Sequence, residues 1–406
     1  MNVKISIILL FLCLNACTNS KRTTLNTVKS QKSPYVILIS VDGLRHDYIK
    51  KYNPPTLSKI KENGLAAESL IPIFPSKTFP NHYSIVTGMY AENHGLISNS
   101  FYDPNLKKTY SLGNREAVEN GVWYDGEPIW ITAKKNNMVS ASYFWVGSEA
   151  NIKGMHPDYY LKYDHKIPGE TRVDKVIEWL ELPADERPHF ITLYFSEVDS
   201  AGHDFGPNSK EVKTALFNVD DYINRLSTKI KKFDFPINII IVSDQGMTEI
   251  SNKHKVILPS EIENNPKINI VGKGALSLIY IKDNSLIQST YENLKNINGI
   301  DVYLKKDIPA NYHFKNNSRI PEIIISPKMP YYIAAEKKNI QGGTHGYDPI
   351  NKDMHGIFMA IGPNIKSQSI KSFENIHIYP FITKLLGINY DHQIDGDPSV
   401  LNNFLK

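Results

Sequence analysis

Short apolar runs of strand length recur along the chain, with polar or helical sequence between them. Such a run is typical of a strand buried on both faces, as in a parallel sheet covered by helices. Apolar stripes at helical spacing separate the runs, the clearest from Val212 to Ile230 and another from Thr171 to Leu180. This alternation predicts an α/β fold with a mostly parallel central sheet and helices on both faces. The expected strands are Tyr35–Val41, Phe190–Phe195, Ile237–Val242, Leu276–Ile281, Ile323–Ile325 and Ile357–Ile361.

Nothing in the 406 residues divides the chain into separate large domains, because no repeat and no Pro- or Gly-rich linker is found. We therefore expect one domain over residues 34–406, with an insert or small subdomain over about residues 261–341, the least regular stretch. The formal net charge is only +4, and Lys and Arg are scattered. This charge pattern argues against binding to nucleic-acid duplexes.

The N-terminus has the features of an export signal. Lys4 precedes an apolar run over residues 5–14, which is short for a membrane span and typical of a signal-peptide core. The run ends in Leu-Asn-Ala-Cys17, which resembles a bacterial lipoprotein cleavage site. We expect a signal peptide over residues 1–16, a lipid on Cys17 and a flexible tether over residues 17–33. A plain secretory signal or a membrane anchor is the alternative. Both cysteines of the chain lie in this segment, so the mature protein has no disulfide.

Acidic residues follow three of the expected strands. Asp42 follows the first, Asp199 lies four residues after the second, and Asp244 lies two residues after the third. A single aspartate in such a place is usually a turn or a helix cap. The carboxyl ends of strands in open α/β sheets form ligand sites, so we expect these three carboxylates to converge on one pocket.

Two histidines complete a candidate metal set. His203 follows Asp199 by four residues, and Gly202 between them would let the chain bend so that both face one ion. His345 lies in a glycine-rich loop that exposes its imidazole. One carboxylate and two imidazoles form a zinc-like set with a position open for substrate. The alternative is a pair of surface histidines in loops.

Thr78 is a candidate nucleophile. Pro80 suits the first turn of a helix, which places Thr78 just before the helix N-terminus. Free N–H groups and the helix dipole favour a bound phosphate there. A threonine hydroxyl attacks at neutral pH only if it is activated, for example by a metal. The alternative is that Thr78 is merely an N-cap.

Taken together, these segments resemble the nucleotide pyrophosphatase/phosphodiesterase family of the alkaline-phosphatase superfamily. The matching stretches are VDGLRHDY, FPSKTFPNHYSIVTGMYAENHGLISN, GEPIW, YFWVGSE, RPHFITLYFSEVDSAGHDFGP, VSDQGM and GGTHGYD. The resemblance implies an alkaline-phosphatase-like fold and a two-metal mechanism. It implies one zinc held by Asp199, His203 and His345, and a second ion held by Asp42, Asp244 and the Thr78 oxygen. Thr78 would attack phosphorus and form a phosphothreonine ester.

The same resemblance assigns substrate-binding residues. Asn99 would donate a hydrogen bond to a phosphate oxygen, and Phe79 and Tyr163 match an aromatic pair that sandwiches a nucleobase. Trp145 occupies the place of another pocket wall, although core packing is the favoured explanation for it.

The chain departs from the family pattern at Gln245, where a histidine is usual. A glutamine carbonyl is a weaker zinc ligand and suits harder cations, so the second metal would be zinc, magnesium or manganese. Some nucleotide-specific members also carry a lysine near the position of Ala117, where this chain has no basic residue, although Arg115 is close.

The leading function is therefore metal-dependent hydrolysis of phosphodiester or pyrophosphate bonds in nucleotides, which releases nucleoside 5′-monophosphates. The alternatives are a lipid-headgroup phosphodiesterase, a phosphomonoesterase, or a metal-binding lipoprotein with weakened catalysis. The expected partners are a small nucleotide and, through Cys17, a bacterial membrane facing the periplasm or the cell surface. No protein partner is implied.

Overall fold

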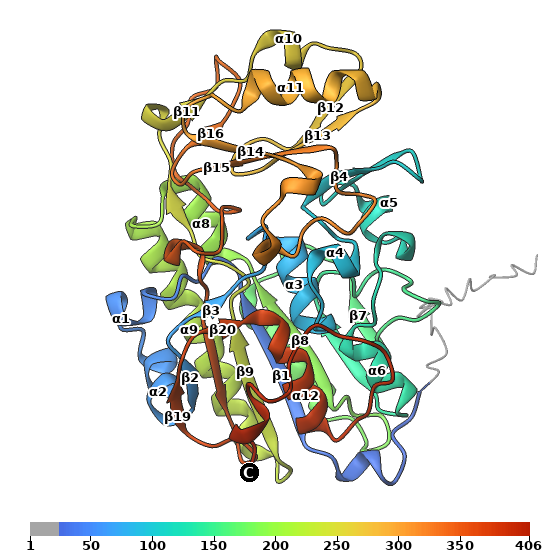
Figure 1. Ribbon diagram of the computed structural model, residues 1–406. Coiled ribbons are helices and arrows are strands. Elements are labelled where there is room, and N and C mark those ends of the chain that lie inside the picture. The colour runs from blue at the N-terminus through green and yellow to red at the C-terminus, as the bar shows by residue number, and fades with distance from the viewer. Residues whose placement is uncertain (1–23) are drawn as a thin grey trace, which may run out of the picture.

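The computed structural model describes residues 24–406 and centres on an eight-stranded sheet (Figure 1). Its strand order is β19-β2-β18-β9-β1-β8-β6-β7. All neighbours pair in parallel except β18, which runs antiparallel to both β9 and β2, so the expected mostly parallel sheet is confirmed. The strands are β1 (Tyr35–Val41), β2 (Leu65–Ala67), β6 (Ser140–Tyr143), β7 (Tyr159–Leu161), β8 (Phe190–Phe195), β9 (Ile237–Val242), β18 (Phe358–Ile361) and β19 (Gln368–Ile370).

Helices bury both faces of this sheet. In β1, Val36 and Leu38 pack into one hydrophobic core, while Ile37 and Ile39 pack into the other. This alternation explains why the strand is apolar at every position except Ser40. The helices that pack into the first core are α3 (Thr78–Thr87), α6 (Ile129–Lys135) and α12 (Ile378–Leu386), and those in the second are α1 (Tyr48–Tyr52), α2 (Pro55–Asn63), α7 (Gly169–Leu180) and α9 (Lys210–Lys229).

A second sheet forms a lobe above the first (Figure 1). It is antiparallel, in the order β12-β13-β15-β14, and has its own core with α11 (Ile287–Leu294). Two of the expected strands, β13 and β15, lie in this sheet, within the stretch of about residues 261–341 where an insert or small subdomain is expected. The connection from β12 to β13 is only five residues, too short for the crossover that parallel strands need. The strands are β12 (Ile268–Val271), β13 (Ser277–Ile281), β14 (Ile300–Leu304) and β15 (Ile323–Pro327).

Shorter helices and strands connect and flank the two sheets. The helices are α4 (Ala91–His94), α5 (Arg115–Val118), α8 (Glu197–Phe205) and α10 (Ser260–Glu263). The paired strands are β3 (Leu70–Ile71) with β20 (Phe373–Glu374), β4 (Ser100–Asp103) with β5 (Lys108–Ser111), β10 (Thr248–Glu249) with β17 (Gly343–Thr344), and β11 (Lys255–Val256) with β16 (Tyr332–Ile333).

Part of the expected tether is packed on the domain. The Asn26 side chain donates hydrogen bonds to the carbonyls of Ala184 and Arg187 and accepts one from the Val139 amide. Ser30 is buried and donates to the Asn137 carbonyl. Residues 24–33 therefore form an ordered edge of the domain, because their polar side chains satisfy backbone groups at the end of the sheet. The signal peptide, Cys17 and the start of the tether lie outside the described residues.

Within residues 24–406, none of the helices combines the length and the apolar character required to cross a bilayer.

Candidate active site

The three acidic strand ends are neighbours in the sheet. Strand β1 lies between β9 and β8, so Asp42, Asp244 and Asp199 follow adjacent parallel strands. Asp42 and Asp244 are buried, and Asp199 is half-buried. The expectation that these carboxylates converge follows from this topology, because the carboxyl ends of adjacent parallel strands meet at one edge.

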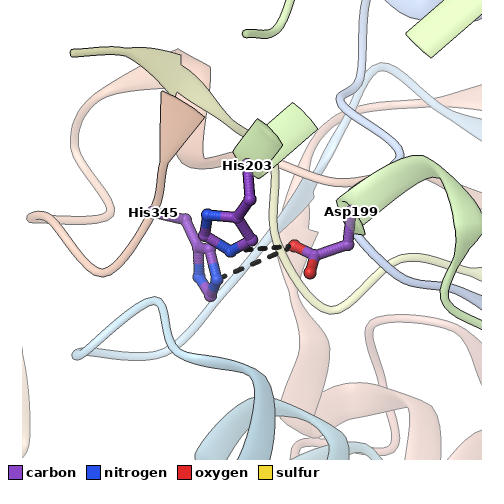
Figure 2. Close-up of side chains that lie close together, drawn as sticks. All are labelled: Asp199, His203 and His345. Atoms are coloured by element: carbon purple, nitrogen blue, oxygen red, sulfur yellow. Dashed lines mark ion pairs between the residues drawn. The ribbon is translucent and has the colours of Figure 1, made fainter. Parts of the chain in front are cut away.

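One candidate metal group comprises Asp199, His203 and His345 (Figure 2). The Nε2 atoms of His203 and His345 lie 3.5 and 3.8 Å from Asp199 Oδ1. Asp199 and His203 lie one turn apart on α8, so a regular helix brings them together and the bend expected at Gly202 is not needed. Gly202 instead leaves room for Met247, which would lie 3.0 Å from an added Cβ.

Backbone carbonyls orient the two imidazoles. His203 Nδ1 lies 2.9 Å from the Gly343 carbonyl, and His345 Nδ1 lies 2.7 Å from the Ser76 carbonyl. Each Nδ1–H therefore donates, which leaves each Nε2 as a lone pair aimed at the shared space. The His345 imidazole, which the sequence predicts to be exposed, is instead buried, because its ring packs against the Ser76 carbonyl. This burial lowers the pKa of His345 well below its usual value, so its ring is neutral and in the form that binds a metal.

A second group comprises Asp42, Asp244 and His82. Both oxygens of Asp244 are buried and have no hydrogen-bond partner among the described residues. Burial and the carboxylate of Asp244 raise the pKa of Asp42, and burial and the carboxylate of Asp199 raise the pKa of Asp244. Unpaired, mutually repelling carboxylates are costly without a counter-ion, so a bound cation fits this group.

Gln245 joins the two groups. Its Nε2 donates to Asp42 Oδ1 at 2.9 Å and to Asp199 Oδ1 at 3.0 Å, while its Oε1 is buried without a partner. In this arrangement the amide nitrogen rather than the carbonyl oxygen faces the carboxylates. Gln245 therefore occupies the position between the groups that the sequence predicts for a ligand, but it partly offsets the negative charge as a donor.

His82 belongs to the site and was missed from the sequence. Its Nε2 lies 2.8 Å from Ser40 Oγ, and its Nδ1 lies 3.0 Å from the Thr78 carbonyl and 3.4 Å from Asp244 Oδ2. Both nitrogens are engaged, so His82 positions the first turn of α3. Its spacing of four residues from Thr78 was the available signal.

Thr78 is the first residue of α3, one position later in the helix than the N-cap that the sequence predicts. Lys77 precedes it in an extended conformation and makes no side-chain cap. The Phe79 amide donates to Asn99 Oδ1 at 2.9 Å, which fixes the Asn99 side chain beside the helix N-terminus. The Asn99 amide nitrogen is then left as a donor, as its expected role requires.

Lys77 braces the loop that carries His345. Its Nζ donates to the His345 carbonyl at 2.8 Å, and burial lowers the pKa of Lys77 to about 8. The left-handed backbone of Gly346, with φ of 113°, leaves room for this side chain.

A cavity of about 290 Å³ contains these groups and extends away from them. Thr78, Asn99 and the candidate metal ligands Asp42, Asp199, His203 and His345 line it, whereas Asp244, Gln245 and His82 are not among its lining residues. Its other lining residues are Phe79, Leu112, Arg115, Val118, Phe144, Trp145, Val146, Glu149, Tyr163 and Tyr194. A nucleotide-sized molecule needs such a cavity with a polar end and an apolar body.

The aromatic residues predicted to bind substrate line this cavity. Tyr163 is 38% exposed and packs edge-on against Phe144, with ring centroids 5.1 Å apart. Phe79 is partly buried and packs edge-on against Tyr110. Trp145 is almost fully buried, and its Nε1 donates to the His82 carbonyl at 3.0 Å, so it serves the core and the cavity wall together.

Tyr194 is another residue that the sequence did not reveal. Its hydroxyl donates to Asp42 Oδ2 at 2.6 Å, and burial raises the pKa of the Tyr194 hydroxyl well above its usual value. Tyr194 thereby orients a candidate metal ligand from strand β8. Its neighbours in that strand are apolar, so the sequence pattern indicates only a buried strand there.

Comparison with known proteins gives relatives over most of the chain. Ectonucleotide pyrophosphatase/phosphodiesterase family member 1 of Rattus norvegicus is 38% identical over 374 residues, which cover 88% of this chain and 41% of the rat protein. Venom phosphodiesterase CdcPDE of Crotalus durissus collilineatus is 36% identical over 390 residues, 93% of this chain and 47% of the venom protein. The chain spans less than half the length of these relatives.

Solved structures share the fold. An inactive threonine-to-alanine variant of murine ectonucleotide pyrophosphatase/phosphodiesterase 5, in complex with AMP, gives a TM-score of 0.86 at 29% identity, covering 92% of this chain and 100% of that one. The human protein of the same name gives 0.85 at 31% identity, covering 91% of this chain and 99% of that one. A family model described as type I phosphodiesterase / nucleotide pyrophosphatase matches residues 36–348. The chain therefore belongs to the type I phosphodiesterase/nucleotide pyrophosphatase family.

Proposed function

We propose that this protein hydrolyses phosphodiester and pyrophosphate bonds in nucleotides and releases nucleoside 5′-monophosphates through a phosphothreonine ester at Thr78. The observation that carries the proposal is the position of Thr78, which opens α3 and lines the same cavity as Asp42, Asp199 and His345. The family and the AMP complex of the murine relative support a nucleotide as substrate.

Two divalent ions fit the donor sets of the site. The unpartnered oxygens of Asp244 and the free Nε2 atoms of the two histidines support this assignment. We assign zinc to the imidazole-rich group, and zinc, magnesium or manganese to the oxygen-rich group. When bound, these ions would lower the pKa of the Thr78 hydroxyl and neutralise charge on the phosphate. The residues that would hold them are Asp199, His203 and His345 for one ion, and Asp42, Asp244, Gln245 and the Thr78 oxygen for the other.

The reaction would proceed by two displacements at phosphorus. Thr78 Oγ attacks in line and forms an oxygen–phosphorus bond, and the leaving group departs with its bonding electrons. Water then attacks the same phosphorus, the bond to Thr78 breaks, and the monophosphate leaves. The backbone N–H of Thr78 at the start of α3 and the side-chain amide of Asn99 would stabilise the charged oxygens. Because Asn99 is neutral, this arrangement favours a diester over the more highly charged monoester.

The nucleobase would lie between Phe79 and Tyr163, with Trp145 as a further wall. The exposed face of Tyr163 supports this placement. Stacking accepts every base, because each has a π-face.

The proposal is tested by comparing the hydrolysis of a nucleotide aryl diester with that of the matching aryl monoester, using the purified protein supplied with zinc. We expect strong preference for the diester and its loss in Thr78→Ala. Preference for the monoester would move the protein to phosphatase chemistry. Absence of turnover with both esters would favour a metal-binding role.

We further propose that the protein is exported and held at a bacterial membrane through a lipid on Cys17. The support is the sequence pattern of residues 1–17. Metabolic labelling with a fatty acid should mark the full chain and not a Cys17→Ser variant. Equal labelling of both would contradict the anchor.

A further inference from the structure

The cavity has a charged end that is separate from the two candidate metal groups. Apart from candidate metal ligands, the only charged residues that line it are Arg115 and Glu149, and Arg115 is its one arginine or lysine among the described residues. Arg115 opens α5, which lies across α3 from the helix α8 that carries Asp199 (Figure 1). The cavity therefore runs from a metal-ligand end to an arginine end, past Phe79 and Tyr163.

Glu149 is already engaged at this end. Its Oε1 accepts the Tyr163 amide at 3.0 Å, its Oε2 accepts a hydrogen bond from Arg115 Nη2, and its side chain is only 5% exposed. The carboxylate thus ties the backbone of Tyr163 to the guanidinium of Arg115. An aromatic wall and a cation are held in a fixed relation to each other.

Arg115 keeps unused donors. Its Nη2 bonds to Glu149 and, at 3.2 Å, to Glu119, but no acceptor among the described residues bonds to its Nε or Nη1. Its side chain is 43% exposed. A guanidinium carries only hydrogen-bond donors, so a ligand atom that bonds to Arg115 must be an acceptor. A ligand group that carries its own N–H₂ would meet a donor there.

We propose that Arg115 determines base preference by selecting nucleobases that present a carbonyl oxygen as O6 of a purine or O4 of a pyrimidine. This inference rests on the proposed function, because it requires a base between Phe79 and Tyr163. Guanine offers O6 with N7, and uracil offers O4, whereas adenine and cytosine place an amino group at the equivalent position. Arginine pairs well with the guanine edge, and such a pair discriminates against the wrong base by about tenfold or more.

The test measures kcat/KM of the metal-loaded protein for the p-nitrophenyl 5′-esters of guanosine, uridine, adenosine and cytidine monophosphates. We expect the guanosine and uridine esters to be favoured over the adenosine and cytidine esters by about tenfold. Arg115→Met should bring these ratios close to one. Arg115→Lys, which keeps the charge but loses the planar fork, should give intermediate ratios.

Arg225→Met is the matched control. Arg225 is 42% exposed and pairs with Asp174 on the far side of the second core, outside the cavity lining. The Arg225→Met variant should keep the kcat/KM ratios of the unaltered protein. Equal rates for all bases, or ratios that survive Arg115→Met, would overturn the inference while the proposed function stands. Absence of turnover with all of these esters would overturn both.

Discussion

Gln245 is the residue that most distinguishes this site from the family pattern. It donates hydrogen bonds to Asp42 and Asp199, while neither carboxylate oxygen of Asp244 has a hydrogen-bond partner among the described residues. An amide in this position links the two carboxylates but supplies at best one weak ligand oxygen. The two metal sites should therefore differ in affinity for zinc.

Gln245→His should raise the affinity of the weaker zinc site by about tenfold or more, because an imidazole nitrogen is a better zinc ligand than an amide oxygen. Competition with a coloured chelator measures this affinity directly. Gln288→His, which replaces an exposed glutamine on α11, is the control and should leave the zinc affinity unchanged. Equal zinc affinities in Gln245→His and the unaltered protein would contradict the assignment of Gln245 to the weaker zinc site.

His94 makes stability depend on pH. Its Nδ1 accepts the Leu96 amide, its Nε2 lies 3.0 Å from Ser84 Oγ, and burial lowers the pKa of His94 to about 3. The unfolded chain, with a pKa near 6.5, binds this proton first as the pH falls. Stability should therefore decrease below about pH 6.5, by up to ~1.4 kcal/mol per pH unit from this group.

Urea unfolding at pH 7 and pH 5 checks this prediction. His94→Gln should be less stable at pH 7 but should lose less stability between the two pH values than the unaltered protein. The comparison isolates His94 from other buried histidines such as His189. An identical loss in both proteins would show that His94 does not carry the effect.

At the scale of elements, sequence pattern predicted some strands and helices well. The run Tyr35–Val41 is a strand with the same bounds, because both of its faces are buried and all of its side chains except Ser40 are apolar. The same rule predicted β13 and β15 as strands, but it does not say which strands pair with them, since pairing depends on the path of the chain between strands. Helix α8 was missed because its short, partly polar sequence contains Gly202.

The sequence likewise predicted only part of the candidate site. Asp42, Asp199 and Asp244 could be placed together from strand ends alone. The roles of His82, Tyr194 and Glu149 depend on contacts between distant segments, which no local pattern encodes.

Asp220 shows how one helix supports another. It lies buried within α9, and its carboxylate accepts the amides of Thr56 and Leu57 at 3.0 and 2.7 Å at the start of α2. It acts as an N-cap supplied by a different helix. Asp220→Ala should lower the free energy of unfolding by about 1–3 kcal/mol, because both amides lose their acceptor.

Asp221→Ala is the control for that prediction. Asp221 is the exposed neighbour on the same helix, and surface changes of this kind stay within about 0.5 kcal/mol. Urea unfolding of the two variants measures the difference. Equal effects would contradict the capping role of Asp220.

At the scale of the molecule, the candidate active site lies at the carboxyl ends of β9, β1 and β8, adjacent parallel strands of the main sheet. Glu92 on α4 accepts the amides of Lys315 and Asn316, and Arg319 pairs with Asp103 at 2.8 Å. These contacts fix the segment that follows β14 against the elements beside the cavity. Most of the candidate metal ligands lie on the segments that follow β1, β8 and β9, and His345 lies in the loop after β17. Other loops and helices around the cavity supply the walls that are expected to bind substrate.

The stereochemical course at phosphorus tests the central claim, which is attack by Thr78 followed by attack by water. A nucleotide aryl ester made chiral at phosphorus with sulfur would be hydrolysed in ¹⁸O-labelled water, and the configuration of the product determined. Two in-line displacements predict overall retention of configuration. Overall inversion would mean that water attacks directly, and it would contradict the role given to Thr78.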